Sequence, residues 1–157
     1  MKHYIDKETN EVYAYESDGS QDAFIKKGLV AVSDEELATL RAPTTDQLLQ
    51  QLTQARKEQE TQGVTINNIR YAGDPGNRQA LQEAIAFMGD AGLTEFPAWK
   101  DSDDVFHADH PLADVKDAAR AIGARRSHLI AAEGEYAAQI IAGTLTDLTE
   151  EIGRAHV

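Results

Sequence analysis

Alternating apolar and polar positions at the start of the chain predict short β-strands. Residues 2–5 (KHYI) and 12–15 (VYAY) combine aromatic and branched side chains, and a polar, turn-forming segment follows each of them. Residues 24–32 predict a third strand, or two short strands broken at Gly28. This small meander needs something packed against one face, because two or three strands alone are barely stable in water.

Helix signals follow the meander. Ser33 is a candidate N-cap, and Glu36 completes a capping box three residues later. Pro43 ends this short helix. A second helix is expected up to Gln62, with few apolar positions, which lie on a narrow stripe: Leu48, Leu49, Leu52 and Ala55. A stripe this narrow suits a spacer better than a core element, so we interpret residues 44–62 as a helical linker.

The second half opens with a hairpin signal after Gly63. Apolar residues alternate over residues 64–72 around Asn67 and Asn68. This pattern predicts either a tiny hairpin with a two-residue turn or one kinked strand.

A loop, a helix and two strands are expected next. Residues 73–77 (GDPGN) have turn chemistry. The helix that follows has apolar residues at three- and four-residue spacing: Leu81, Ala84, Ile85 and Met88. The strands are expected at 96–100 and 105–108, on either side of a polar turn at 101–104.

The last apolar pattern predicts one long helix. Asp109 is a candidate N-cap, and Pro111 fits the first turn, where a missing N–H does no harm. Apolar residues then recur every seven positions and form what we call the apolar seam: Val115, Ile122, Leu129 and Tyr136. About 30 residues of helix would span ~45 Å.

Two charged residues, Arg126 and Glu133, occupy alternate positions of this seam. A continuous dry coiled coil is therefore not expected, and the polar pair favours a wet seam or one specific for a partner or register. Two other interpretations stay open. Gly123 or Gly134 can break the helix into a hairpin, or the helix can lie on its own domain.

These patterns predict an α+β protein. The chain of 157 residues, 41% of them apolar, suits one ordinary domain or two small ones. We expect a β-rich N-terminal module at 1–43, the helical linker at 44–62, and a strand-helix-strand module at 63–157 that ends in the long helix.

The net charge limits the classes of partner that we expect. The chain has 27 acidic and 15 basic residues, a formal net charge of −12, so neither a nucleic acid nor an anionic membrane is an expected partner. It has no cysteine, which excludes disulfides and thiolate chemistry. The first residues lack the apolar core of a signal peptide, and no stretch approaches a membrane span. We therefore expect the protein in a cytoplasm.

Residues 101–110 (DSDDVFHADH) hold the candidate metal ligands. Asp103, His107 and His110 would be the ligands if the protein were a metal-dependent hydrolase. The segment lacks the glycine and terminal glutamate of an EF-hand, and the two histidines lie at a strand-to-helix junction. A turn with surface histidines is the simpler interpretation. We expect no enzyme activity, no catalytic residues, no cofactor and no metal.

Aromatic residues are few, at 6% of the chain. The single tryptophan, Trp99, lies near Phe96 and Phe106. We favour Trp99 and Phe106 as core residues that bridge the strands to the helix at 78–88, over Trp99 as an exposed anchor for a partner. The candidate partner-contact residues are aromatic or belong to the apolar seam: Tyr13, Tyr15, Phe24, Trp99, Val115, Ile122, Leu129 and Tyr136.

Both halves carry a family resemblance. The string GVTINNIRY at 63–71, Asp74, QALQEA at 79–84, the Trp99-Lys100 pair and the long alanine-rich helix resemble a domain of unknown function from tailed-phage tail proteins. This likeness covers about residues 63–145. The N-terminal string YAYESDGSQDAFI at 13–25 and the SDEEL helix start at 33–37 resemble phage tail fibre assembly proteins.

The resemblance implies a role but no site residues. It implies a non-enzymatic chaperone that assists the trimeric tail fibre protein in the bacterial host cytoplasm and can stay on the virion tail. A structural baseplate or receptor-contacting subunit is the alternative, with homo-oligomers formed through the apolar seam.

Overall fold

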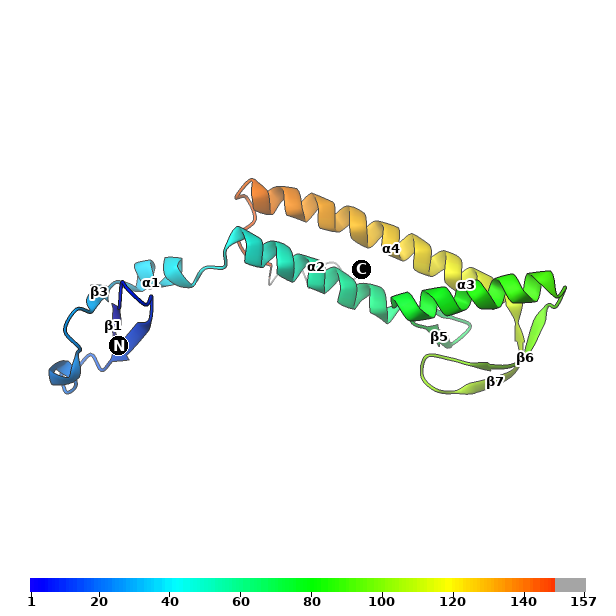
Figure 1. The fold of residues 1–157 in the computed structure, drawn as a ribbon, viewed down its shortest axis with the longest axis horizontal. Helices are drawn as coiled ribbons and strands as arrows, with labels where there is room; N and C mark the ends of the chain where they lie inside the picture. The colour runs from blue at the N-terminus through cyan, green and yellow to red at the C-terminus, as the bar shows by residue number, and fades with distance from the viewer. Residues whose placement is uncertain (149–157) are drawn as a thin grey trace. The chain divides into compact units, whose positions relative to one another are not determined.

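The computed structural model describes residues 1–148 and divides into two compact units, Met1–Thr44 and Thr45–Val157. We call them the N-terminal and the C-terminal unit. As expected, the fold is α+β, with antiparallel strands at the start, small strand pairs later and a long last helix (Figure 1). None of the helices in the described part of the chain is long and apolar enough to cross a membrane.

The N-terminal unit is built on a three-stranded antiparallel sheet of order β2-β1-β3. The strands are β1 (Lys2–Ile5), β2 (Val12–Tyr15) and β3 (Val30–Val32). The third strand is shorter than the 24–32 expected. Phe24 lies in a 3₁₀ turn, η1 (Asp22–Phe24), and Gly28 takes a positive φ of 97° that reverses the chain before β3.

Helix α1 (Asp34–Arg41) follows the sheet and has the predicted capping box. Glu36 N–H donates to Ser33 Oγ at 3.1 Å, and Ser33 N–H donates to Glu36 Oε2 at 2.8 Å. Leu37 of this helix and Ile5 of β1 are the two buried apolar residues of the unit. The core of the N-terminal unit is therefore very small.

Helix α2 (Thr45–Gln62) belongs to the C-terminal unit and is not a separate linker. It runs antiparallel to α4 (Leu112–Ile141) along much of its length (Figure 1). At one end of the helix pair, Leu48 and Leu52 of α2 and Ile140 of α4 form a buried apolar cluster with Leu148, which follows α4 in sequence. The narrow stripe of α2 suffices because it faces a single helix, so the expected boundary near Gly63 was wrong and the units divide at Thr44.

The predicted Asn67-Asn68 hairpin is present between β4 (Val64–Ile66) and β5 (Ile69–Tyr71). Both asparagines take positive φ, 50° and 63°, as a two-residue turn of this kind requires.

Helix α3 (Pro75–Asp90) begins earlier than expected. Residues 74–77 are its start and not a loop, because Asp74 is the N-cap and accepts hydrogen bonds from the N–H groups of Gly76 and Asn77. Pro75 fits the first position because its missing N–H would have had no helical partner.

The second hairpin pairs β6 (Glu95–Lys100) with β7 (Phe106–Pro111), as predicted around a polar turn. Asp109 is not the N-cap of α4. It lies within β7 at a φ of 50°, and Pro111 occupies the cap position without a side-chain hydrogen bond. The strand runs directly into the helix, so no capping loop is left between them.

The main core of the C-terminal unit lies where these elements meet α4. Its buried members come from β5, α3 and α4: Tyr71, Leu81, Val115, Ala118 and Ile122. Trp99 packs against this core from β6, as expected, and Phe96 of the same strand packs beside it. The same expectation was wrong for Phe106, which lies at the start of β7 with 72% of its surface exposed.

Candidate functional site

The most unusual group of side chains is an aromatic and histidine cluster on the β6–β7 hairpin. Tyr71 Oη lies 2.7 Å from His110 Nε2. The Trp99 ring stacks on the His110 ring, with centroids 5.4 Å apart and an interplanar angle of 26°. His110 is only 2% exposed, so it is a core residue and not the surface histidine that we expected. No local pattern indicated this position, because Tyr71 lies 39 residues away in sequence.

Burial sets the protonation of this pair. It raises the pKa of Tyr71 to about 12, with smaller effects in the same direction from Asp114 and Asp101. Burial also lowers the pKa of His110, while Asp114 opposes and His107 adds to this effect. Both groups are therefore neutral near pH 7, and a neutral hydrogen-bonded pair costs much less to bury than a charged one.

Asp101 organises the turn between β6 and β7. Its Oδ1 accepts the N–H groups of Asp103 and Val105, each at 2.9 Å, and its Oδ2 lies 2.8 Å from His107 Nε2. The bond to His107 is the largest of the effects that lower the pKa of Asp101. The predicted turn at 101–104 is therefore confirmed, and Asp101 holds it closed.

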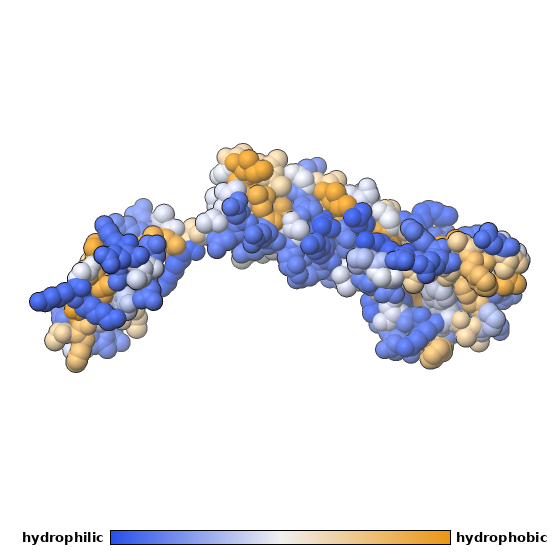
Figure 2. All heavy atoms as spheres, in the orientation of Figure 1, coloured by the Kyte–Doolittle hydropathy of each residue, from blue (hydrophilic) through white to orange (hydrophobic). Residues whose placement is uncertain are grey.

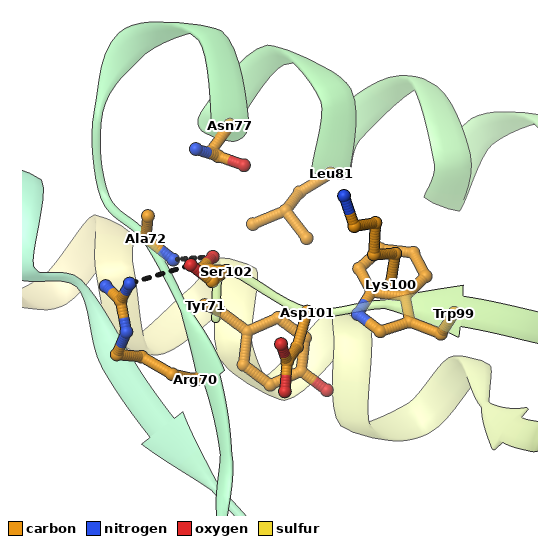
Figure 3. Close-up of a pocket in the computed structure, with 9 residues that line it drawn as sticks. All are labelled: Arg70, Tyr71, Ala72, Asn77, Leu81, Trp99, Lys100, Asp101 and Ser102. Atoms are coloured by element: carbon orange, nitrogen blue, oxygen red, sulfur yellow. Dashed lines mark hydrogen bonds between the residues drawn. The ribbon is translucent and has the colours of Figure 1, made fainter. Parts of the chain in front are cut away.

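A small pocket lies between this hairpin and α3 (Figure 3). Ser102, in the turn of the hairpin, connects one wall of this pocket to β5 and the residue after it. Ser102 Oγ accepts the Ala72 N–H at 2.7 Å, and Ser102 O accepts a hydrogen bond from the Arg70 side chain at 2.8 Å. The ring nitrogen of Trp99 faces the interior and is buried without a hydrogen-bond partner (Figure 3). The volume is about 30 Å³, which suits one water-sized group and not a substrate or cofactor.

The structure does not assemble the candidate metal ligands. Asp103 pairs with Arg70 at 2.7 Å, while His107 and His110 contact Asp101 and Tyr71. Within residues 1–148 there is no group of three or more His, Cys, Asp or Glu side chains placed to hold a metal ion.

Two of the aromatic candidates of the N-terminal unit, Tyr13 and Tyr15, share one face of its sheet. Strand register places Tyr13 opposite Tyr4 and Tyr15 opposite Lys2, and the Tyr4 and Tyr15 rings meet edge to face at 5.6 Å. The missed residue is Tyr4, which the two-residue period of β1 and β2 would have placed there. Phe24 lies in η1 with 74% of its surface exposed.

The apolar seam of α4 is used inside the chain. Val115 is fully buried and Ile122 is 4% exposed, so these two are core residues and not available for a partner. Leu129 and Tyr136 are half-buried. Tyr136 packs against the cluster that joins α2 and α4.

The two charged seam positions pair with α2. Glu133 Oε1 accepts from Thr53 Oγ1 at 2.6 Å, and Arg56 Nε lies 2.5 Å from Glu133 Oε2. The Nε–H bond does not point at this oxygen, so the Arg56 contact is an ion pair and not a hydrogen bond. Arg126 Nε lies 3.4 Å from Glu60 Oε2. Both residues therefore pair within the chain, and the charged positions of the α4 seam face α2.

These features define a two-unit α+β protein whose larger unit combines a helix pair with two small hairpins. The chain belongs to the family described as Domain of unknown function (DUF4376), whose model matches residues 43–154. This match includes α2, in agreement with the boundary at Thr44. No curated protein and no solved structure matches the chain.

Proposed function

We propose that this chain is a non-enzymatic phage tail protein that assists assembly of the trimeric tail fibre in the bacterial host cytoplasm. The resemblance of residues 13–37 to tail fibre assembly proteins motivates the proposal. The observation that carries it is the incomplete N-terminal unit, whose small core and open sheet suit a module that docks on another protein.

The exposed fractions of the apolar side chains show how small this core is. Ile5 and Leu37 are buried, whereas Phe24 is 74%, Leu40 53% and Val30 41% exposed. Apolar atoms are visible on the surface of this unit (Figure 2). A unit of 44 residues buries too little apolar surface to be very stable by itself. Contact with a partner would cover these side chains and stabilise the unit.

The open sheet offers the second kind of contact. Because β1 is central, β2 and β3 are both edge strands, and each presents unpaired backbone groups on its outer side. An extended segment of a fibre subunit can add to such an edge. A groove beside β3, lined by Ile5, Val32 and Leu40 among others, offers space for apolar side chains of that segment.

Co-expression with the tail fibre protein tests the proposal. The yield of soluble, trimeric fibre, measured by size-exclusion chromatography, is expected to rise several-fold when the chain is present. Phe24→Ser is expected to reduce this gain, whereas Phe87→Ser, a similarly exposed phenylalanine on α3, is the matched control. A fibre that folds and trimerises equally well without the chain would overturn the proposal.

Mass spectrometry of purified virions then separates a chaperone that departs from one that stays. Absence from the particle indicates a departing assembly factor. Presence at a fixed ratio to the fibre indicates a chain that remains on the tail as a structural subunit.

A further inference from the structure

Four arginines gather where α2, α3 and α4 meet, and we call them the arginine cluster: Arg56, Arg78, Arg125 and Arg126. They are four of the eight arginines in a chain with a net charge of −12. Such a local excess of positive charge in an acidic protein is not explained by the overall composition.

Glu60 lies at the centre of the cluster and is 8% exposed. Arg56 Nη1 pairs with its Oε1, while Arg78 Nη1 and Arg126 Nε lie 3.3 and 3.4 Å from its Oε2. Three guanidinium groups therefore share one carboxylate. Since Arg56 also pairs with Glu133, the four arginines have only two acidic partners among these contacts.

Arg125 has no acidic partner in the described structure. Its Nη2 donates to the Gln59 side-chain oxygen at 3.2 Å, and its Nε is buried with no hydrogen-bond partner. Together with the shared carboxylate of Glu60, this leaves the cluster with two more positive than negative charges. A partly buried surplus of charge is costly unless an opposite charge compensates it.

Tight backbone contacts hold the cluster in place. A Cβ atom on Gly73 would lie 2.0 Å from the Glu60 carbonyl oxygen, so the start of α3 approaches α2 as closely as the backbone permits. Arg78 Nη1 donates to Gly73 O at 2.6 Å, which fixes this guanidinium beside Glu60. Donors fixed in advance lose little entropy when a ligand binds.

Two of the arginines are accessible from solvent. The side chain of Arg126 is 44% exposed and that of Arg78 is 25% exposed, and both approach the same oxygen of Glu60. The planar guanidinium fork matches the oxygens of a carboxylate or a phosphate. We propose that the arginine cluster is a binding site for an oxyanion, a carboxylate or phosphate group, held by Arg126 and Arg78.

Titration of the full-length chain with inorganic phosphate and with hexaglutamate tests this site. The readout is the arginine Nε–H signals in ¹H–¹⁵N spectra, with sodium chloride at equal ionic strength as the reference. Saturable shifts with either probe and none with chloride are expected. Tighter binding of hexaglutamate identifies acidic side chains of a protein as the natural source, and tighter binding of phosphate identifies a phosphate group.

Arg126→Gln should weaken binding about tenfold, because it removes one charge-assisted contact. Arg126→Lys, which keeps the charge and loses the fork, should fall between this variant and the wild type. Arg120→Gln is the matched control, since Arg120 is 76% exposed on the same helix and pairs only with Asp117 among the contacts described. Equal shifts with chloride, or equal affinities of the Arg126→Gln and Arg120→Gln variants, would overturn the proposal. Circular dichroism melting curves verify that each variant is folded.

Discussion

The Tyr71 hydroxyl lies 2.7 Å from Nε2 of His110, and both side chains are buried in the core of the C-terminal unit. The Trp99 ring stacks on the imidazole ring. A titratable ring in this position links the hairpin β6–β7, the strand β5 and the start of α4. Its protonation state therefore bears on the stability of the whole unit.

Acidification should destabilise the protein through His110. Burial lowers the pKa of His110 below its ordinary value of 6.5, so the unfolded chain binds the proton more readily than the folded one. The stabilising contribution is complete above about pH 6.5 and is lost as pH falls through the folded pKa. We expect the melting temperature to fall between pH 7.5 and 5.5, a window in which ordinary carboxylates do not titrate.

The control for this pH effect is another histidine. His110→Gln should flatten the dependence of the melting temperature on pH, whereas His128→Gln, an exposed position on α4, should keep the slope of the wild type. Parallel slopes for wild type and His110→Gln would show that other groups carry the effect.

Tyr71→Phe should lower the free energy of unfolding by about 1–3 kcal/mol. The change removes the hydroxyl that pairs with the buried His110 ring, and an unsatisfied buried polar group costs about this much. Urea denaturation measures the loss. Tyr15→Phe, at a half-buried tyrosine of β2, should change stability by less than about 0.5 kcal/mol.

Local signals in the sequence predicted the local structure well. The capping box of Ser33 and Glu36 and the turn at Asn67 and Asn68 were found because all of their determinants lie within a few residues. Each contact satisfies backbone groups at a fixed sequence spacing, so the pattern and the geometry coincide.

Long-range pairing was not predictable in the same way. Residues 44–62 suited a linker because the apolar stripe is narrow, and nothing local showed that Arg56 would meet Glu133 across 77 positions of sequence. One signal was present: Arg126 and Glu133 are spaced by seven residues, as are Thr53 and Glu60. Two antiparallel helices can align polar residues that have the same spacing. In the structure Thr53 pairs with Glu133, and Glu60 pairs with Arg126.

The candidate site was only partly predictable for the same reason. Trp99 was correctly favoured as a core residue from nearby aromatic residues in the sequence. His110 was expected at the surface because its partner, Tyr71, belongs to a strand on the far side of α3 in sequence. Burial of a polar ring depends on such a partner, which spacing alone does not reveal.

Val115→Ala should destabilise the C-terminal unit by about 1–3 kcal/mol, because Val115 is fully buried and its truncation leaves a cavity. The reason is packing within the chain, so the molar mass from light scattering should not change. Ile141→Ala is the matched control on the same helix, since Ile141 is 70% exposed and should cost less than about 0.5 kcal/mol. A change of oligomeric state in the Val115 variant would contradict this interpretation and indicate that the apolar seam forms a contact between chains.

Gly73→Ala should lower the free energy of unfolding by about 2 kcal/mol or more, because the added Cβ would lie 2.0 Å from the backbone oxygen of Glu60. Backbone atoms cannot rotate away, so α2 and α3 must separate and Arg78 must leave Glu60. Gly89→Ala is the matched control, since Gly89 lies within α3 with nothing within 4 Å of its Cβ position. There alanine should stabilise the helix by about 0.5–1 kcal/mol. Urea denaturation compares the two variants, and equal stabilities would mean that the close approach of Gly73 to Glu60 does not constrain the fold.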